Sequence, residues 1–196
     1  MGSRRLGRQR LMSLEKRGTP LQKSQFGMGA GMSDTFVRAN KYRDGSLVVV
    51  EMVLDLGTAD AAIASFAGND VIGVDGASGT IFTWDYAVHG YIIDLEMLVL
   101  ENPTTGDDDL HIYHHTAEIN ANAAGHSGTT DTTVDITAAV KGKSHSAAIG
   151  TGDLSGGAKY FYIVSDGSTT GTYATGKVLI RTTGFVLDES AADTFV

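Results

Sequence analysis

The sequence predicts an all-β protein, a jelly-roll-like β-sandwich preceded by an extended basic N-terminal arm. Three observations favour this fold class: 25 glycines in 196 residues, short apolar segments separated by glycine turns, and positive charge gathered near the N-terminus. Glycine costs about 1 kcal/mol per helical site relative to alanine, so the composition favours strands and turns over long helices. The length suffices for one domain with its own core.

Charge divides the chain into two parts. Residues 1–43 contain ten Lys and Arg against two acidic residues, whereas the remaining chain contains five against twenty-one. We therefore predict a basic extended arm at residues 1–34 and a β-sandwich body at residues 35–196. Because glycine alternates with other residues at 26–32, we expect this stretch to be a flexible connector that packs against no core.

The arm holds the residues that we expect to bind a partner. Arginine pairs well with both carboxylates and phosphates, so an acidic protein surface and a nucleic acid are both suitable. The acidic body would repel nucleic acid, so we expect direct nucleic-acid contact to play no part. The alternative is that the arm is only a solvated tail. The predicted partner-binding residues are Arg4, Arg5, Arg8, Arg10, Leu11, Leu14, Lys16, Arg17 and Lys23.

The body contains about eight segments with the periodicity of strands, bounded by turn residues such as Asp-Gly. Their irregular spacing and the long loops between some of them favour a Greek-key or jelly-roll sandwich over simple hairpins. Within the small-residue stretch 57–79, residues 61–66 fit either a helical turn or an insert. The predicted strands are 35–42, 46–56, 80–88, 91–100, 110–116, 132–140, 159–165 and 176–186.

Individual strands differ in the faces they present. The segment 46–56 is apolar on both faces, which is typical of a strand inside a sandwich. The segment 80–88 carries Phe82, Trp84 and Tyr86 on one face, which we interpret as a core face rather than a ligand platform.

The segment 91–100 mixes apolar and acidic residues. Alternation predicts that Asp94 and Glu96 share a face with Ile92, so this face should meet solvent or a partner near its middle. The run at 159–165 is apolar throughout and predicts a buried strand, and 176–186 alternates in the manner of a strand with one core face.

Residues 107–115 form the densest polar cluster, with three aspartates followed by three histidines. His111 and His115 can share one face of a strand, so a divalent metal site is conceivable, but a solvated loop leading into an exposed edge strand is the simpler interpretation. The three aspartates lack the glycine and glutamate of an EF-hand loop. We predict no metal and no cofactor.

Several classes of protein are excluded or disfavoured. The sequence has no cysteine, so disulfides and thiolate metal sites are excluded. No apolar run approaches the 18 residues of a membrane span, and no signal peptide is evident. The Gly-x-Ser-x-Gly nucleophile elbow does not occur. We therefore expect the protein not to be an enzyme.

Several segments resemble structural proteins from tailed phages of marine bacteria. The segment 4–18, RRLGRQRLMSLEKRG, is similar to the opening of such proteins. The resemblance continues in order along most of the chain, but residues 60–80 and 117–157 show none. The further matching points are Arg43-Asp-Gly, Asp55-Leu-Gly, Asn102-Pro-Thr-Thr-Gly, Gly176-Lys-Val-Leu-Ile and Gly184-Phe.

This resemblance implies a virion structural component with no catalytic residues. Among such roles we expect a capsid decoration (cement) protein on the outer capsid surface, with the major capsid protein as partner and a homotrimer as the assembly. The alternatives are a tail, neck or head-fibre component, or a glycan-binding β-sandwich on the virion. The last would use exposed aromatic residues such as Trp84, Tyr113 or Tyr173.

Overall fold

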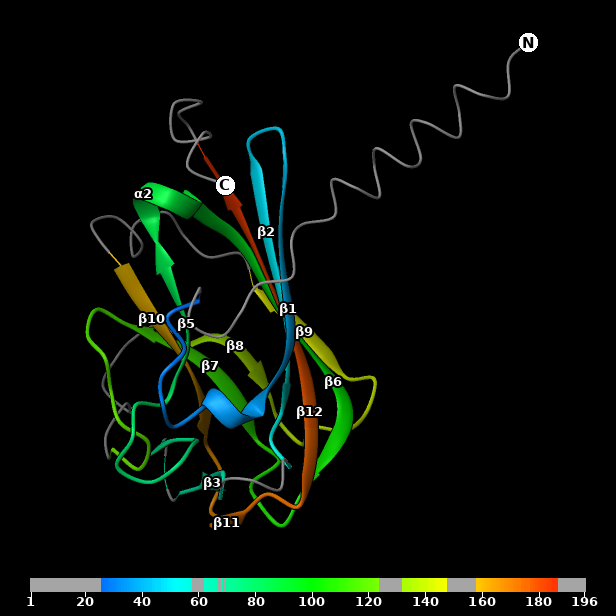
Figure 1. Cartoon of the computed structure of the whole chain (residues 1–196). Coiled ribbons are helices and arrows are strands. Elements are labelled where there is room, and N and C mark those ends of the chain that lie inside the picture. Colours follow the sequence, from blue (N-terminus) through cyan, green and yellow to red (C-terminus); the bar gives the residue numbers. More distant parts are fainter. Residues whose placement is uncertain are drawn as a thin grey trace.

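The protein folds as a β-sandwich of two antiparallel sheets (Figure 1). The computed structural model describes residues 26–57, 62–66, 68, 70–123, 132–147 and 158–186. Nearly every element in this part of the chain is a strand. The all-β sandwich predicted from the sequence is therefore confirmed.

The first sheet has five strands. Strand β12 shows why the sequence forms such a strand, since Val178, Ile180 and Thr182 are buried against the second sheet while Lys177 and Arg181 alternate with them on the outer face. In spatial order the strands are β1 (Phe36–Asp44), β2 (Leu47–Asp55), β12 (Thr175–Phe185), β6 (Tyr91–Thr104) and β9 (Ser144–Ala147).

The second sheet is built around β10, which pairs with β5 and β4 along one side and with β7 along the other. Its strands are β4 (Asp70–Val71), β5 (Thr80–Asp85), β10 (Ala158–Ser165), β7 (Leu110–His115) and β8 (Thr132–Ile136). The short strands β3 (Ala64–Ser65) and β11 (Gly171–Thr172) form a separate pair. A 3-10 turn, η2 (Ser33–Thr35), precedes β1.

The hydrophobic core lies between the two sheets. The rings of Phe82 and Phe161 stack with their centroids 4.4 Å apart, and both side chains are almost completely buried. Ile112 and Ile163 extend this layer within the second sheet, and Met52 lies in the facing layer of the first. Burial of such side chains provides most of the favourable free energy of folding.

The predicted strand 80–88 is shorter than expected. It ends at Asp85, and Tyr86–His89 forms the single helical turn α2. The N–H of Asp85 donates to Nδ1 of His89 over 3.1 Å, and Gly90 has a φ of +73°, a conformation that favours glycine. The indole N–H of Trp84 then donates to the carbonyl of Gly90. These local bonds replace the last residues of the predicted strand.

Strand β6 departs from the predicted faces. Its register with β12 shifts where Thr183 and Gly184 pair with Asp94 and Ile92, so that Ile93 is an extra residue. This bulge lets Ile92 face the core, fully buried, while Asp94 is only half-buried. The expectation that Ile92 shares a face with Asp94 is therefore wrong, because the two-residue period holds only where no bulge interrupts the strand.

We expect acid to destabilise the protein through His89. Burial, together with the nearby charge of Lys41, lowers the pKa of His89 to about 4 from 6.5. The unfolded chain therefore binds a proton at higher pH than the folded chain does, and the free energy of unfolding falls as the pH drops from about 6.5 to about 4.

The substitution H89Q should remove about 2 kcal/mol of this acid-induced decrease in the free energy of unfolding. Urea denaturation of the parent and the variant at pH 7, 5.5 and 4 measures the difference, and pH 8 serves as the reference at which His89 of the parent is neutral in the folded and the unfolded chain. Equal loss of stability in the two proteins between pH 7 and pH 4 would show that His89 is not the responsible group.

Candidate functional site

The predicted partner-binding residues lie outside the described part of the chain. This applies to all nine: Arg4, Arg5, Arg8, Arg10, Leu11, Leu14, Lys16, Arg17 and Lys23. Their role as a binding segment stays a prediction. What the structure describes is the point where this segment joins the body, residues 26–32, which we call the arm root.

The arm root lies along β5 and the turn before it. The N–H of Gly29 donates to the carbonyl of Thr80 over 2.8 Å, and the N–H of Gly31 donates to the carbonyl of Ser78 over 2.7 Å. Successive bonds of this antiparallel kind resemble those of a sheet ladder. The hydroxyl of Thr83 adds a bond to the carbonyl of Gly27. The arm root therefore covers the side of β5 that β10 leaves open.

Its glycines allow this close approach. A Cβ atom on Gly29 would lie 2.3 Å from Oγ of Ser78, and one on Gly31 would lie 2.7 Å from the carbonyl oxygen of Ser78. Gly27 has a φ of +63°, which side chains other than glycine rarely adopt. The alternating glycines thus serve backbone packing against the body.

Two apolar side chains anchor the arm root in the core. Phe26 is 6% exposed and Met32 is fully buried, and both belong to the main hydrophobic core. The hydroxyl of Thr35 donates to the carbonyl of Met32 over 2.6 Å and closes the turn into β1. The expectation that residues 26–32 form a connector without core contacts is therefore wrong. Burial of the flanking apolar residues and the close backbone contacts of the glycines together stabilise this stretch by more than the lost conformational entropy of glycine costs.

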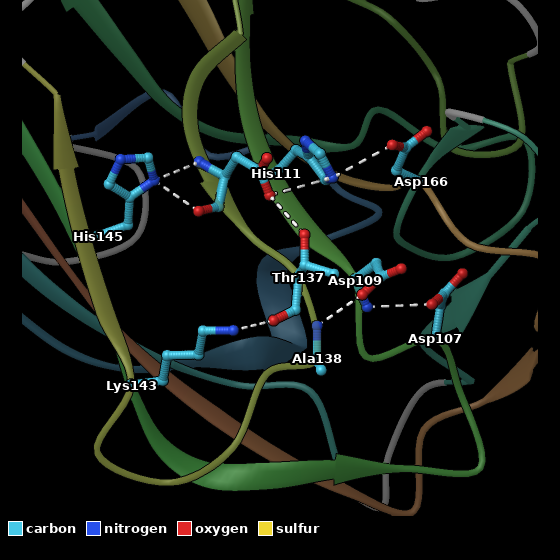
Figure 2. A network of polar contacts seen from close by, with 9 residues as sticks. Asp107, Asp109, His111, Thr137, Ala138, Lys143, His145 and Asp166 are labelled. Atoms are coloured by element: carbon cyan, nitrogen blue, oxygen red, sulfur yellow. Dashed lines mark hydrogen bonds and ion pairs between the residues drawn. The ribbon is translucent and has the colours of Figure 1, made fainter.

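A second polar region joins the loops at one end of the sandwich (Figure 2). His111 on β7 is 6% exposed, and its Nε2 lies 3.6 Å from a carboxylate oxygen of Asp135 on β8 and 3.6 Å from one of Asp166 after β10. Nδ1 of His145 accepts the N–H of Asp135 over 3.1 Å. The imidazole of His111 therefore lies between carboxylates from two neighbouring segments.

The aspartates before β7 serve the same end of the fold. Asp107 is 2% exposed, and one of its carboxylate oxygens accepts the N–H of Asp109 over 3.0 Å. Asp109 in turn accepts the N–H of Ala138 over 2.6 Å. Tyr173 donates its hydroxyl to the carbonyl of Asp107, and burial raises the pKa of this tyrosine. These contacts connect three loops and indicate a structural role.

The sequence alternatives for residues 107–115 can now be compared. Strand β7 pairs with β10 on one side and β8 on the other, so the interpretation as an exposed edge strand is wrong. His114 packs against the ring of Phe161 with centroids 5.7 Å apart. Among the described residues, no group of three or more acidic, histidine or cysteine side chains has the arrangement to hold a metal ion.

The aromatic residues proposed for glycan binding are buried. Trp84 is 2% exposed, Tyr173 4% and Tyr113 9%. Trp84 and Tyr173 belong to the core between the sheets, whereas Tyr113 packs with Tyr162 in a smaller cluster. The expectation that these three side chains are exposed is therefore wrong, because each of them packs against other apolar side chains.

The outer face of the first sheet carries a ladder of ion pairs. Arg181 lies 2.8 Å from Glu51 and 3.3 Å from Glu96, and these carboxylates raise the pKa of the guanidinium. Lys177 lies 2.9 Å from Asp55. Nearby, a shallow, polar depression of about 500 Å³ is lined by Leu100, Glu101, Asn102, Thr104, Lys141, Thr175 and Lys177. Lys177, the cation that β12 contributes to its lining, is already paired with carboxylates.

Within the described residues, no helix has the length and apolar character needed to cross a membrane. Comparison with known proteins gave no further assignment, since no protein-family model, curated protein or solved structure matches the chain. The likeness to phage structural proteins therefore stays a prediction from the sequence.

Proposed function

We propose that the chain is a structural protein of a virus particle, a decoration protein on the outer capsid surface. In this proposal the arm extends across neighbouring major capsid subunits and stabilises the head, and the bodies associate as a homotrimer. No catalytic step and no cofactor are assigned. The observation that carries the proposal is a cationic segment joined to an acidic sandwich through a root that is built into the core.

The strand order supports this role. Without β1 and the two-residue strands, eight strands remain, and we number them along the chain from β2 to β12. The first sheet then has the order 1-8-3-6 and the second the order 2-7-4-5. Two Greek keys folded together produce this order in a jelly roll, a fold that viral capsid proteins share with lectins and cupins. The fold is compatible with the role, and the charge distribution carries it.

The chemistry of the arm favours a protein partner. Seven Lys and Arg stand against one Glu in residues 1–25, so the arm suits a groove lined with carboxylates. A body with twenty-one acidic residues after position 43 would be repelled by nucleic acid. A root fixed on the sandwich places every arm at the same point of the surface, which suits a symmetric lattice of subunits.

Deleting residues 1–25 should abolish binding to purified heads while the body stays folded. A matched pair of variants tests the charge: R4Q/R5Q in the arm should weaken binding about tenfold, whereas K141Q/K143Q in the body should leave it unchanged. Co-sedimentation with heads over a range of protein concentrations measures the binding, and circular dichroism checks the fold.

Full occupancy of heads by the truncated protein would overturn the arm as the anchor. A second experiment separates particles into heads and tails. Recovery of the protein with tails or necks would overturn head decoration and favour a tail, neck or head-fibre component instead.

A further inference from the structure

Strand β1 is the long open edge of the sandwich. It has nine residues, and within the described part of the chain it pairs only with β2. The opposite edge of the same sheet, β9, has four residues, and the open side of β5 is covered by the arm root. An edge strand presents unpaired N–H and C=O groups that can accept one more strand.

The edge is cationic on an otherwise acidic body. Arg38 is exposed, and Lys41 and Arg43 are half-buried. On β12, which β2 separates from this edge, Lys177 and Arg181 pair with carboxylates of their own sheet. Burial lowers the pKa of Lys41 to about 8, so a carboxylate brought beside it would offset part of its lost hydration.

These charges restrict what can pair with β1. A second β1 strand would bring like charges together, and the arm at residues 1–25 is cationic as well. An acidic, extended segment fits. Residues 187–196, LDESAADTFV, contain three acidic residues and no basic one, and they follow Val186 directly. At about 3.3 Å per residue, their ten residues can span the nine of β1.

We propose that segment 187–196 of a second copy of this chain adds a strand to the edge of β1. In the antiparallel register that we infer, Asp188 lies opposite Arg43 and Asp193 lies opposite Arg38. Main-chain hydrogen bonds supply the pairing, and the opposed charges select the register.

A neighbouring copy fits this register better than the same chain does. The N–H of Val186 donates to the carbonyl of Ser46, so the segment leaves β12 beside the turn between β1 and β2. To reach the far side of β1 in its own chain, it must cross three inter-strand spacings, roughly 14 Å, which uses about four residues. Asp188 and Glu189 would then lie near the exposed Asp44 instead of the cations.

The test is a charge swap measured by sedimentation equilibrium. The parent should self-associate, and deletion of residues 187–196 should leave monomers at every concentration. Each single variant, R38E or D193R, should weaken association about tenfold, and the double variant R38E/D193R should recover it to within about threefold. Arg38 is chosen because it is exposed, so that its replacement leaves the core intact.

Mixing the two single variants distinguishes pairing between copies from pairing within one chain. The R38E and D193R proteins should associate with each other more tightly than either does with itself. The variant K141E, reversed at another exposed cation, should behave as the parent does. A monomeric parent, a truncated protein that still associates, or a mixture without hetero-association would each overturn the proposal. None of these outcomes depends on head binding, so the proposed virion role is tested separately.

Discussion

Deletion of residues 1–34 should lower the free energy of unfolding by about 5 kcal/mol, whereas deletion of residues 1–25 should change it by less than about 1 kcal/mol. The longer deletion removes Phe26 and Met32 from the core, and each such side chain contributes about 2–5 kcal/mol when buried. It also exposes the backbone of β5 that the arm root covers. Urea denaturation of both truncated proteins and the full chain measures the difference.

The single substitution F26A separates the side-chain contribution from the backbone contribution. It should cost about 3 kcal/mol, less than the longer deletion, because the main-chain bonds of Gly29 and Gly31 remain. If the two deletions left proteins of equal stability, the arm root would not be part of the folding unit, and the boundary predicted at residue 34 would describe the protein better than the structure does.

The substitution F161A should destabilise the protein by about 3–5 kcal/mol. Phe161 lies on β10, the strand that pairs with β4, β5 and β7, and its ring is stacked on Phe82 and packed against His114. Removing the ring leaves a cavity where the second sheet is most constrained by its neighbours, so little relaxation can fill it.

The matched control is F185A. Phe185 also lies in a strand, β12, but is 37% exposed, so its loss should cost less than about 1 kcal/mol. Thermal or urea unfolding followed by circular dichroism compares the two variants. Comparable destabilisation by F161A and F185A would mean that the core is not centred on β10.

The fold class could be predicted from the sequence because its signals are local. Alternation in β12 and the apolar run of β10 each depend on neighbouring residues alone, and both strands lie close to their predicted positions. The position of β7 between two other strands depends on partners far along the chain. Polar residues such as His111 and His114 suggested an exposed edge, although the fold buries them.

The arm root was missed for a related reason. Gly27, Gly29 and Gly31 were interpreted through the freedom that glycine gives an isolated chain. Their actual role depends on Ser78 and Thr83, about fifty residues away, which approach them too closely for a side chain. The signal available in the sequence was the pair of apolar residues, Phe26 and Met32, on either side of the glycines.

The way the arm root is attached also bears on how the protein responds to force. The bonds from Gly29 to Thr80 and from Gly31 to Ser78 follow one another along β5 and the turn before it. A force along β5 loads both hydrogen bonds together, in shear, and does not open them one after the other. The ring of Phe26 must also leave the core before either hydrogen bond can break. In the decoration role that we propose, swelling of the particle under internal pressure would therefore pull on an arm that is firmly attached to the body.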